Sequence, residues 1–185
     1  MQEILAKLET SQKEFWNISR VTGRFLNILV REANAENVLE IGTSNGYSGI
    51  WLGSAVRRTG GKLITIEYWE KRLSIAKENF IKCGLADYIE AIQGDAIEVL
   101  NALPADYTAD FVFIDANKSQ YLQYFEIIDK HLKPGGIIAC DNVLSHKEKC
   151  RPFIETVNAR PDYYNVILDL PAGLSLAKKL AVKCD

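Results

Sequence analysis

Oxygen-bearing side chains follow two apolar, β-prone runs of this chain at the points where the runs end. Asp115 follows the run 111–114, and Asp141 and Asn142 follow the run 136–140. A buried parallel strand reads as a nearly continuous apolar run, and open α/β sheets bind ligands where such strands end. Two carboxylates and an amide there would suit a divalent cation, with Mg²⁺ favoured over Mn²⁺ or Ca²⁺. Lys118, one helical turn after Asp115, is a candidate general base beside that cation.

A second group of polar residues surrounds the first predicted strand-to-helix turn. Glu40 precedes the segment Gly42-Thr-Ser-Asn-Gly46, whose glycines permit a sharp turn and a close approach of the backbone to a ligand. Glu67 ends the next predicted strand, 21 residues past Gly46 (67 − 46), where a carboxylate can accept hydrogen bonds from ribose hydroxyls. That acid alone would also suit NAD. The glycine spacing is G-x-x-x-G and not G-x-G-x-x-G, which disfavours a dinucleotide.

Strands and helices alternate from residue 37 onward, after a helical N-terminal section over 1–35 that forms two pieces. We expect strands over 38–41, 63–66, 89–92, 111–114 and 137–140, helices over 47–57, 70–83, 96–103, 119–132 and 147–158, and a hairpin of 164–170 and 174–178. A repeated strand–helix pattern predicts an α/β fold with a parallel sheet and right-handed crossovers. The hairpin would add an antiparallel strand at one edge. Because no linker or repeat interrupts the pattern, we expect one domain over 1–185.

Composition excludes several classes of protein. The net charge of −2 provides no general basic field for nucleic acid. No apolar stretch approaches the roughly 20 residues of a membrane span, and the first residues lack a signal-peptide pattern. The scattered cysteines, with no CxxC pair, are typical of reduced thiols: Cys83, Cys140, Cys150 and Cys184. We therefore expect a cytoplasmic protein without membrane partners.

Several segments together resemble the metal-dependent S-adenosylmethionine O-methyltransferases, the group of the catechol and caffeoyl-CoA enzymes and their bacterial relatives. The resemblance extends from Trp16-Asn-Ile-Ser19 to the terminal hairpin and is carried by residues 40–48, 64–67, 94–96, 113–118 and 141–142. It implies a Rossmann-like class I methyltransferase fold, a mostly parallel seven-stranded sheet with a C-terminal antiparallel hairpin and helices on both faces. It also implies S-adenosylmethionine as the cofactor.

The resemblance further implies which positions would hold that cofactor and the metal. The methionine part would be contacted by Ile18, Glu40, Gly42, Thr43 and Ser48. The ribose and the adenine would be contacted by Glu67, Tyr68, Asp95 and Ala96. Asp115 would lie beside the sulfonium and would also ligate the metal, together with Asp141 and Asn142.

The implied reaction is methyl transfer to a hydroxyl of a small aromatic acceptor, catechol-like or of the hydroxycinnamoyl type, with the metal and Lys118 promoting deprotonation. Here the segment after Asn142 is shorter and more polar than in many relatives, which predicts a shallow, open acceptor pocket. His146 lies on that segment, and its contact with the acceptor stays open. A small basic cluster at the rim could meet an acidic acceptor: Lys147, Lys149 and Arg151.

Two alternatives remain at this stage. A relative that methylates a hydroxyuridine of tRNA could use the same site, although the net charge of −2 disfavours a nucleic-acid partner. A nucleotide-binding module without methyl-transfer chemistry is disfavoured by the complete set of Asp115, Lys118, Asp141 and Asn142. A homodimer is possible because the amphipathic N-terminal helix could pack on a second copy.

Overall fold

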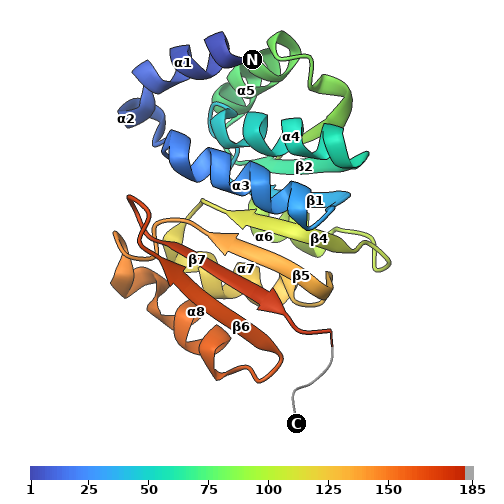
Figure 1. The fold of residues 1–185 in the computed structure, drawn as a ribbon, viewed down its shortest axis with the longest axis vertical. Helices are drawn as coiled ribbons and strands as arrows, with labels where there is room; N and C mark the ends of the chain where they lie inside the picture. The colour runs from blue at the N-terminus through green and yellow to red at the C-terminus, as the bar shows by residue number, and fades with distance from the viewer. Residues whose placement is uncertain (182–185) are drawn as a thin grey trace.

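Seven strands form one mixed sheet in a computed structural model, which describes residues 1–181 (Figure 1). The strand order is β3-β2-β1-β4-β5-β7-β6. Strands β1 to β5 pair in parallel, whereas β7 is antiparallel to both β5 and β6. The strands are β1 Asn37–Ile41, β2 Lys62–Glu67, β3 Ile89–Gln93, β4 Ala109–Ile114, β5 Leu132–Cys140, β6 Tyr163–Leu168 and β7 Leu174–Lys179. The predicted fold class, including the antiparallel C-terminal hairpin, is confirmed.

Helices cover both faces of this sheet (Figure 1). One hydrophobic core joins α1, α3, α4 and α5 to one face, and a second core joins α6, α7 and α8 to the other. The helices are α1 Gln2–Thr10, α2 Gln12–Phe15, α3 Arg20–Glu32, α4 Tyr47–Thr59, α5 Glu70–Lys82, α6 Ala96–Asn101, α7 Tyr121–Ile128 and α8 Lys147–Ala159. None of the helices within residues 1–181 has the length and hydrophobicity needed to cross a bilayer. Cys184 lies outside the described residues.

The register of three neighbouring strands places the polar residues of interest at one edge of the sheet. Ile114 pairs with Ile41 on one side and with Cys140 on the other. The next residues are therefore neighbours, and the Asp115 amide donates to the Ile41 carbonyl at 2.9 Å while the Asp141 amide donates to the Ile114 carbonyl at 3.0 Å. Successive side chains of β1, β4 and β5 point alternately into the two hydrophobic cores. Because both faces of these strands are buried, only the strand ends are available to a ligand.

One predicted helix differs from the structure at both ends. The helix expected over 119–132 begins as a 3₁₀ turn at Lys118–Gln120, and α7 ends at Ile128. Leu132 already belongs to β5, because it pairs with Ala109 and the His131 carbonyl accepts from the Ala109 amide at 2.8 Å. Gly135 has a φ of +83°, and the register shifts between Ala109 and Phe111. The Pro-Gly-Gly segment therefore lies inside a strand as a local irregularity, where glycine tolerates the left-handed conformation.

Candidate active site

A cavity of about 550 Å³ opens at the carboxyl edge of the sheet. Its wall includes ten residues singled out from the sequence: Ile18, Gly42, Thr43, Ser48, Glu67, Tyr68, Asp95, Ala96, Asp115 and Lys118. The remaining wall includes residues that sequence reasoning did not assign to the site: Phe15, Trp16, Asn17, Ser44, Trp69, Arg72, Asn117, Gln120 and Tyr124. Three of the predicted residues, Glu40, Asp141 and Asn142, do not line the cavity. Volume and wall suit a ligand of nucleoside size.

The turn after β1 allows the backbone to pass close to β4. Gly42 has a φ of +101°, and a Cβ atom there would lie 2.2 Å from the Asp115 carbonyl oxygen. Any other residue would therefore push apart the two strand ends that frame the cavity floor. Gly46, at the start of α4, has a φ of +85°, and a Cβ would lie 2.8 Å from the Phe80 ring. Both glycines of the G-x-x-x-G segment are thus required by positive φ and by close packing.

Glu67 organises the part of the cavity wall where a ribose is expected. Its side chain is 7% exposed, and its two carboxylate oxygens accept from backbone amides, one from Ser44 at 2.8 Å and one from Trp69 at 3.0 Å. A carboxylate has about four acceptor positions, so the fixed oxygens keep capacity for ligand hydroxyls. The Ser44 hydroxyl in turn donates to the Phe15 carbonyl at 2.9 Å.

Asp95 lines the cavity and also caps a helix. It is the N-cap of α6, and its Oδ1 accepts from the amides of Ile97 at 2.9 Å and Glu98 at 3.3 Å. Such a cap fixes the direction of the carboxylate, which leaves its other oxygen for a ligand. The adjacent Ala96 and Tyr68 complete this end of the cavity, and Tyr68 is 59% exposed.

Glu40 lies behind the cavity wall and not in it. The side chain is fully buried, and its Oε2 accepts from the Thr65 hydroxyl, which also bonds the Thr43 hydroxyl at 2.5 Å. Its Oε1 has no hydrogen-bond partner within the described residues. Burial raises the pKa of Glu40 to about 7, while hydrogen bonds from Ser48 and Thr65 oppose this rise. Glu40 therefore supports Thr43 and Ser48, and its predicted contact with the cofactor stays a prediction.

The catalytic candidate Lys118 forms an ion pair with the predicted metal ligand Asp115 at the cavity wall. Lys118 Nζ lies 2.8 Å from Asp115 Oδ1, with side chains 19% and 14% exposed. The pairing follows from the 3₁₀ turn at Lys118–Gln120. Asn117 caps this turn, because its side-chain oxygen accepts a hydrogen bond from the Ser119 amide. The lysine nitrogen is thereby held where the strand end meets the cavity.

Asp141 and Asn142 lie on the next strand end, beside this pair. Asp141 is 4% exposed, and burial followed by the nearby charge of Asp115 raises its pKa to about 7. Asn142 has a left-handed φ of 66°. The fully buried Tyr121 hydroxyl donates to the Asp141 carbonyl at 3.0 Å and fixes this backbone, a support that the sequence did not reveal.

The donor chemistry of this cluster fits a divalent cation. No group of three or more His, Cys, Asp or Glu side chains gathers in residues 1–181, so the set rests on two carboxylates completed by the Asn142 amide. A buried carboxylate whose pKa is raised by a neighbouring carboxylate gains from a positive charge placed between them. Oxygen donors alone favour Mg²⁺, Mn²⁺ or Ca²⁺. Asp115, Asp141 and Asn142 are therefore suited to hold such an ion.

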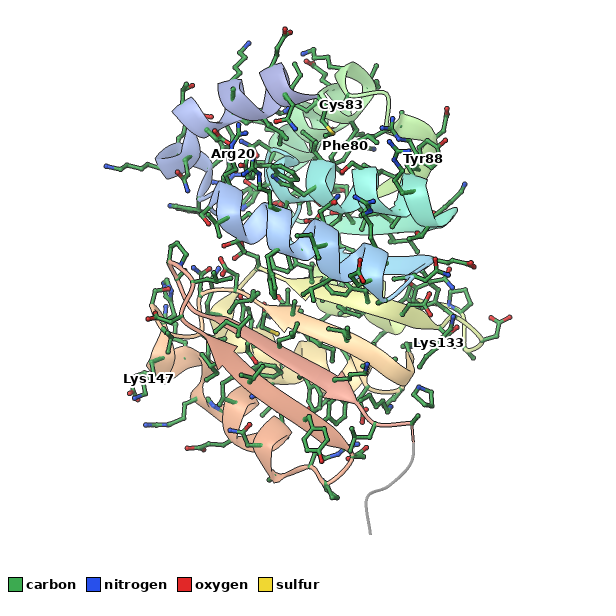
Figure 2. The ribbon with its side chains drawn as sticks, viewed as in Figure 1. Arg20, Phe80, Cys83, Tyr88, Lys133 and Lys147 are labelled. Carbon is green, nitrogen blue, oxygen red and sulfur yellow. The ribbon has the colours of Figure 1, made fainter. Side chains whose placement is uncertain are left out.

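The segment after Asn142 is fixed by the turn of the C-terminal hairpin. The amide of Val143 donates to the Gly173 carbonyl at 3.0 Å, and those of Leu144 and Ser145 donate to the Ala172 carbonyl at 3.2 and 3.0 Å. His146 follows exposed, and Lys147 projects outward at the start of α8 (Figure 2). Because this segment is short and bound to the hairpin, it does not extend over the cavity.

Comparisons with known proteins agree with this geometry. A family model described as O-methyltransferase matches residues 1–171. The chain is 37% identical over 130 residues to a catechol O-methyltransferase of Niastella koreensis, and the alignment covers 69% of the chain and 58% of that protein. It is 30% identical over 182 residues to caffeoyl-CoA O-methyltransferase 1 of Arabidopsis thaliana, covering 94% and 70%. The alignment thus spans less than two thirds of the Niastella protein.

Solved structures share the whole fold. The O-methyltransferase TomG from Streptomyces achromogenes, solved in complex with SAM, superposes with a TM-score of 0.88 at 30% identity, covering 96% of this chain and 90% of that one. An O-methyltransferase from Bacillus cereus in complex with SAH gives a TM-score of 0.85 at 31% identity, covering 96% and 89%. Fold, strand-end residues and family match lead to one conclusion: the chain belongs to the O-methyltransferase family.

Proposed function

We propose that this protein transfers a methyl group from S-adenosylmethionine to a hydroxyl of a small aromatic acceptor that carries two adjacent hydroxyls. The observation that carries the proposal is the convergence of Asp115, Lys118 and Asp141 at neighbouring strand ends, at the edge of a nucleoside-sized cavity. Two comparisons support the proposal. Similar proteins are described as catechol and caffeoyl-CoA O-methyltransferases, and two similar structures were solved in complex with SAM or SAH.

Cofactor and acceptor would occupy different parts of the carboxyl edge of the sheet. Glu67 would bind the ribose, and Ser48 with the backbone of Gly42 would hold the methionine end. S-adenosylmethionine supplies an electrophilic methyl group on its sulfonium when bound. Asp115 lies between these cofactor residues and the second strand end at Asp141, so the acceptor hydroxyl would meet the methyl group there. Holding two reactants in line provides about 7–11 kcal/mol of the barrier reduction at best.

Deprotonation of the acceptor is the second requirement, because a neutral phenol is a weak nucleophile. Asp115, Asp141 and Asn142 would hold a divalent cation, which supplies Lewis acidity that favours the oxyanion form of a bound hydroxyl. Lys118 would receive the proton as a neutral amine, a form that a divalent cation bound at Asp115 would favour by repelling a second positive charge. Its Nζ is held at this edge, 2.8 Å from Asp115 Oδ1. Two adjacent hydroxyls on the acceptor would fix which oxygen faces the methyl group.

The acceptor side would be open, since the segment after Asn142 is bound to the hairpin turn and does not line the cavity. An open pocket favours a broad range of catechol-like acceptors over one tightly enclosed substrate. The N-terminal section contributes Ile18 and Trp16 to the cavity wall.

The test is methylation of a panel of vicinal diphenols with and without chelator. We expect turnover that is lost with chelator and falls at least about a hundredfold in Asp141→Ala, as loss of a metal ligand predicts. Lys118→Met should lower kcat by about 10²–10⁴ through loss of the base while S-adenosylhomocysteine still binds. Chelator-resistant turnover would exclude the metal-assisted mechanism. Binding of S-adenosylhomocysteine without methylation of any diphenol would exclude the small-aromatic acceptor, and hydroxylated tRNA would be tested next.

A further inference from the structure

Residues 15–18, named the strap, run from the last residue of α2 toward α3 and lie at the end of the cavity near Glu67. All four strap residues line the cavity, as do Tyr68 and Trp69 just before α5 and Arg72 in its first turn. The chain is anchored before and after the strap. Before the strap, Glu9 in α1 accepts a hydrogen bond from the Tyr47 hydroxyl at 2.6 Å. After the strap, Ser19 caps α3, and Arg20 (labelled in Figure 2) pairs with Glu9 at 2.8 Å.

The middle of the strap is held differently from its ends. Trp16 has a left-handed backbone, with φ 55° and ψ 36°, and its side chain is 74% exposed. A bulky residue in this conformation is strained, and an exposed tryptophan gains nothing from the core to offset that strain. The guanidinium of Arg72 lies over the Trp16 ring at 4.8 Å from its centroid, and 6.0 Å from that of Phe15.

Apart from these two rings, the Arg72 guanidinium has no partner within residues 1–181: it forms no salt bridge and no side-chain hydrogen bond there. Its position in the cavity wall, 56 residues from Trp16 in sequence (72 − 16), is therefore explained in this structure by the aromatic contact alone. A guanidinium over an indole ring is the stronger form of the cation–π contact.

A second connection links the strap to the ribose carboxylate. Glu67 accepts the Ser44 amide at 2.8 Å, and the Ser44 hydroxyl donates to the Phe15 carbonyl at 2.9 Å. A nucleoside at Glu67 would therefore lie directly beneath a strap bound on one side through Ser44 and on the other through Arg72. Because the strap forms part of the wall, a ligand can leave by this side only when the strap opens.

We propose that the contact between Arg72 and Trp16 is a clasp that closes the strap over the adenosine of the cofactor and sets how fast the cofactor and its product dissociate. Arg72 is thereby a positioning residue that acts through Trp16. The inference rests on the cofactor part of the proposed function and is independent of the acceptor and of the metal.

The test is the dissociation rate of tritiated S-adenosylhomocysteine from the intact protein, measured by rapid filtration after dilution into unlabelled ligand. The variants are Arg72→Ala, Trp16→Ala and their combination, with Trp16→Phe as the conservative change. Lys71→Ala is the matched control, because it removes a positive charge from the neighbouring exposed position of α5 outside the cavity wall. Circular dichroism and the melting temperature check that each variant folds.

We expect Arg72→Ala to speed dissociation by roughly two- to thirtyfold, the range of a cation–π contact, and Lys71→Ala to leave the rate within about twofold. Arg72→Ala should have no further effect in the Trp16→Ala background, since the two residues act as one unit, and Trp16→Phe should retain part of the effect. Independent, multiplying effects of the two alanine changes would overturn the clasp, and so would an Arg72→Ala rate equal to that of Lys71→Ala. A wild-type chain that does not bind S-adenosylhomocysteine would instead contradict the cofactor part of the proposed function.

Discussion

The buried carboxyl of Glu40 should make the stability of this protein fall as the pH rises. Its pKa is raised from 4.5 to about 7, chiefly by burial. Below pH 4.5 the group is protonated in the folded and the unfolded chain alike. Between pH 4.5 and 7 only the unfolded chain loses the proton, so the unfolded state gains stability with each step in pH. Above pH 7 both forms are ionised and the loss is complete.

The size of this effect follows from the two pKa values. A difference of 2.5 units (7 − 4.5), at 1.36 kcal/mol for each unit, is about 3 kcal/mol. The Glu40→Gln change removes the titration and keeps the shape of the side chain. The buried Oε1 atom of Glu40 has no hydrogen-bond partner within the described residues. Any cost of placing an amide there is independent of pH, so it does not alter how the free energy of unfolding changes with pH.

The measurement is urea unfolding of the wild type and Glu40→Gln at several pH values from 4.5 to 8.5, with chelator present so that the charge near Asp115 is constant. The variant should gain up to about 3 kcal/mol relative to the wild type over this range. Glu126→Gln, the same substitution at an exposed acid of α7, is the matched control. A difference between Glu40→Gln and the wild type that is flat with pH would refute the reasoning.

Two further predictions concern stability. Gly42→Ala should lower the free energy of unfolding by more than about 1 kcal/mol, because φ is +101° and the new Cβ would meet the Asp115 carbonyl. Gly84→Ala, at a φ of +65° with open space around it, should cost less, so equal urea midpoints would contradict the close approach. Asp129→Asn should cost about 1–3 kcal/mol, since Asp129 accepts from Tyr163 at 2.7 Å and pairs with Arg160 and Lys179 at 3.0 and 2.8 Å. Because Asp129 has a lowered pKa, that cost should shrink as the pH falls through it, and a pH-independent cost would contradict the ion-pair assignment.

The edge of the sheet that carries the site could be predicted from the sequence, because the end of each strand is marked by a change from apolar to polar residues. Asp115 and Asp141 each terminate an apolar run, and parallel strands of one sheet bring such ends together. The family resemblance then supplied residues of the cofactor pocket, and most of these line the cavity.

The position of Glu40 could have been inferred more fully. Side chains alternate along a strand, and Val38 belongs to the core on the α4 side, so Glu40 must point to that side also. A Cβ on Gly49 of α4 would lie 2.8 Å from the Phe80 ring and 3.1 Å from Glu40 Oε2, so a glycine here lets both the ring and the carboxylate pack against α4. The sequence contains both residues but not their contact.

The clasp and the start of β5 could not be predicted, because both depend on contacts between distant segments. Nothing near Arg72 in the sequence points to Trp16, which lies on another element. A Pro-Gly-Gly segment is a good helix stop by local rules, yet pairing of Leu132 with Ala109 recruits it into a strand. Tertiary pairing outweighed the local preference there.

The order of the strands has a consequence for how the chain is made on the ribosome. β7 comes later in the sequence than every other strand, yet it lies between β5 and β6 in the sheet. Until Lys179 has emerged, the edge of β5 is unpaired and β6 has no neighbour to pair with. A nascent chain therefore presents two open strand edges at the stage when most of its core residues are already available, which is when edge-to-edge association is a hazard. Completion of this seven-stranded sheet, and with it the fixing of the segment after Asn142 by the hairpin turn, awaits the synthesis of β7.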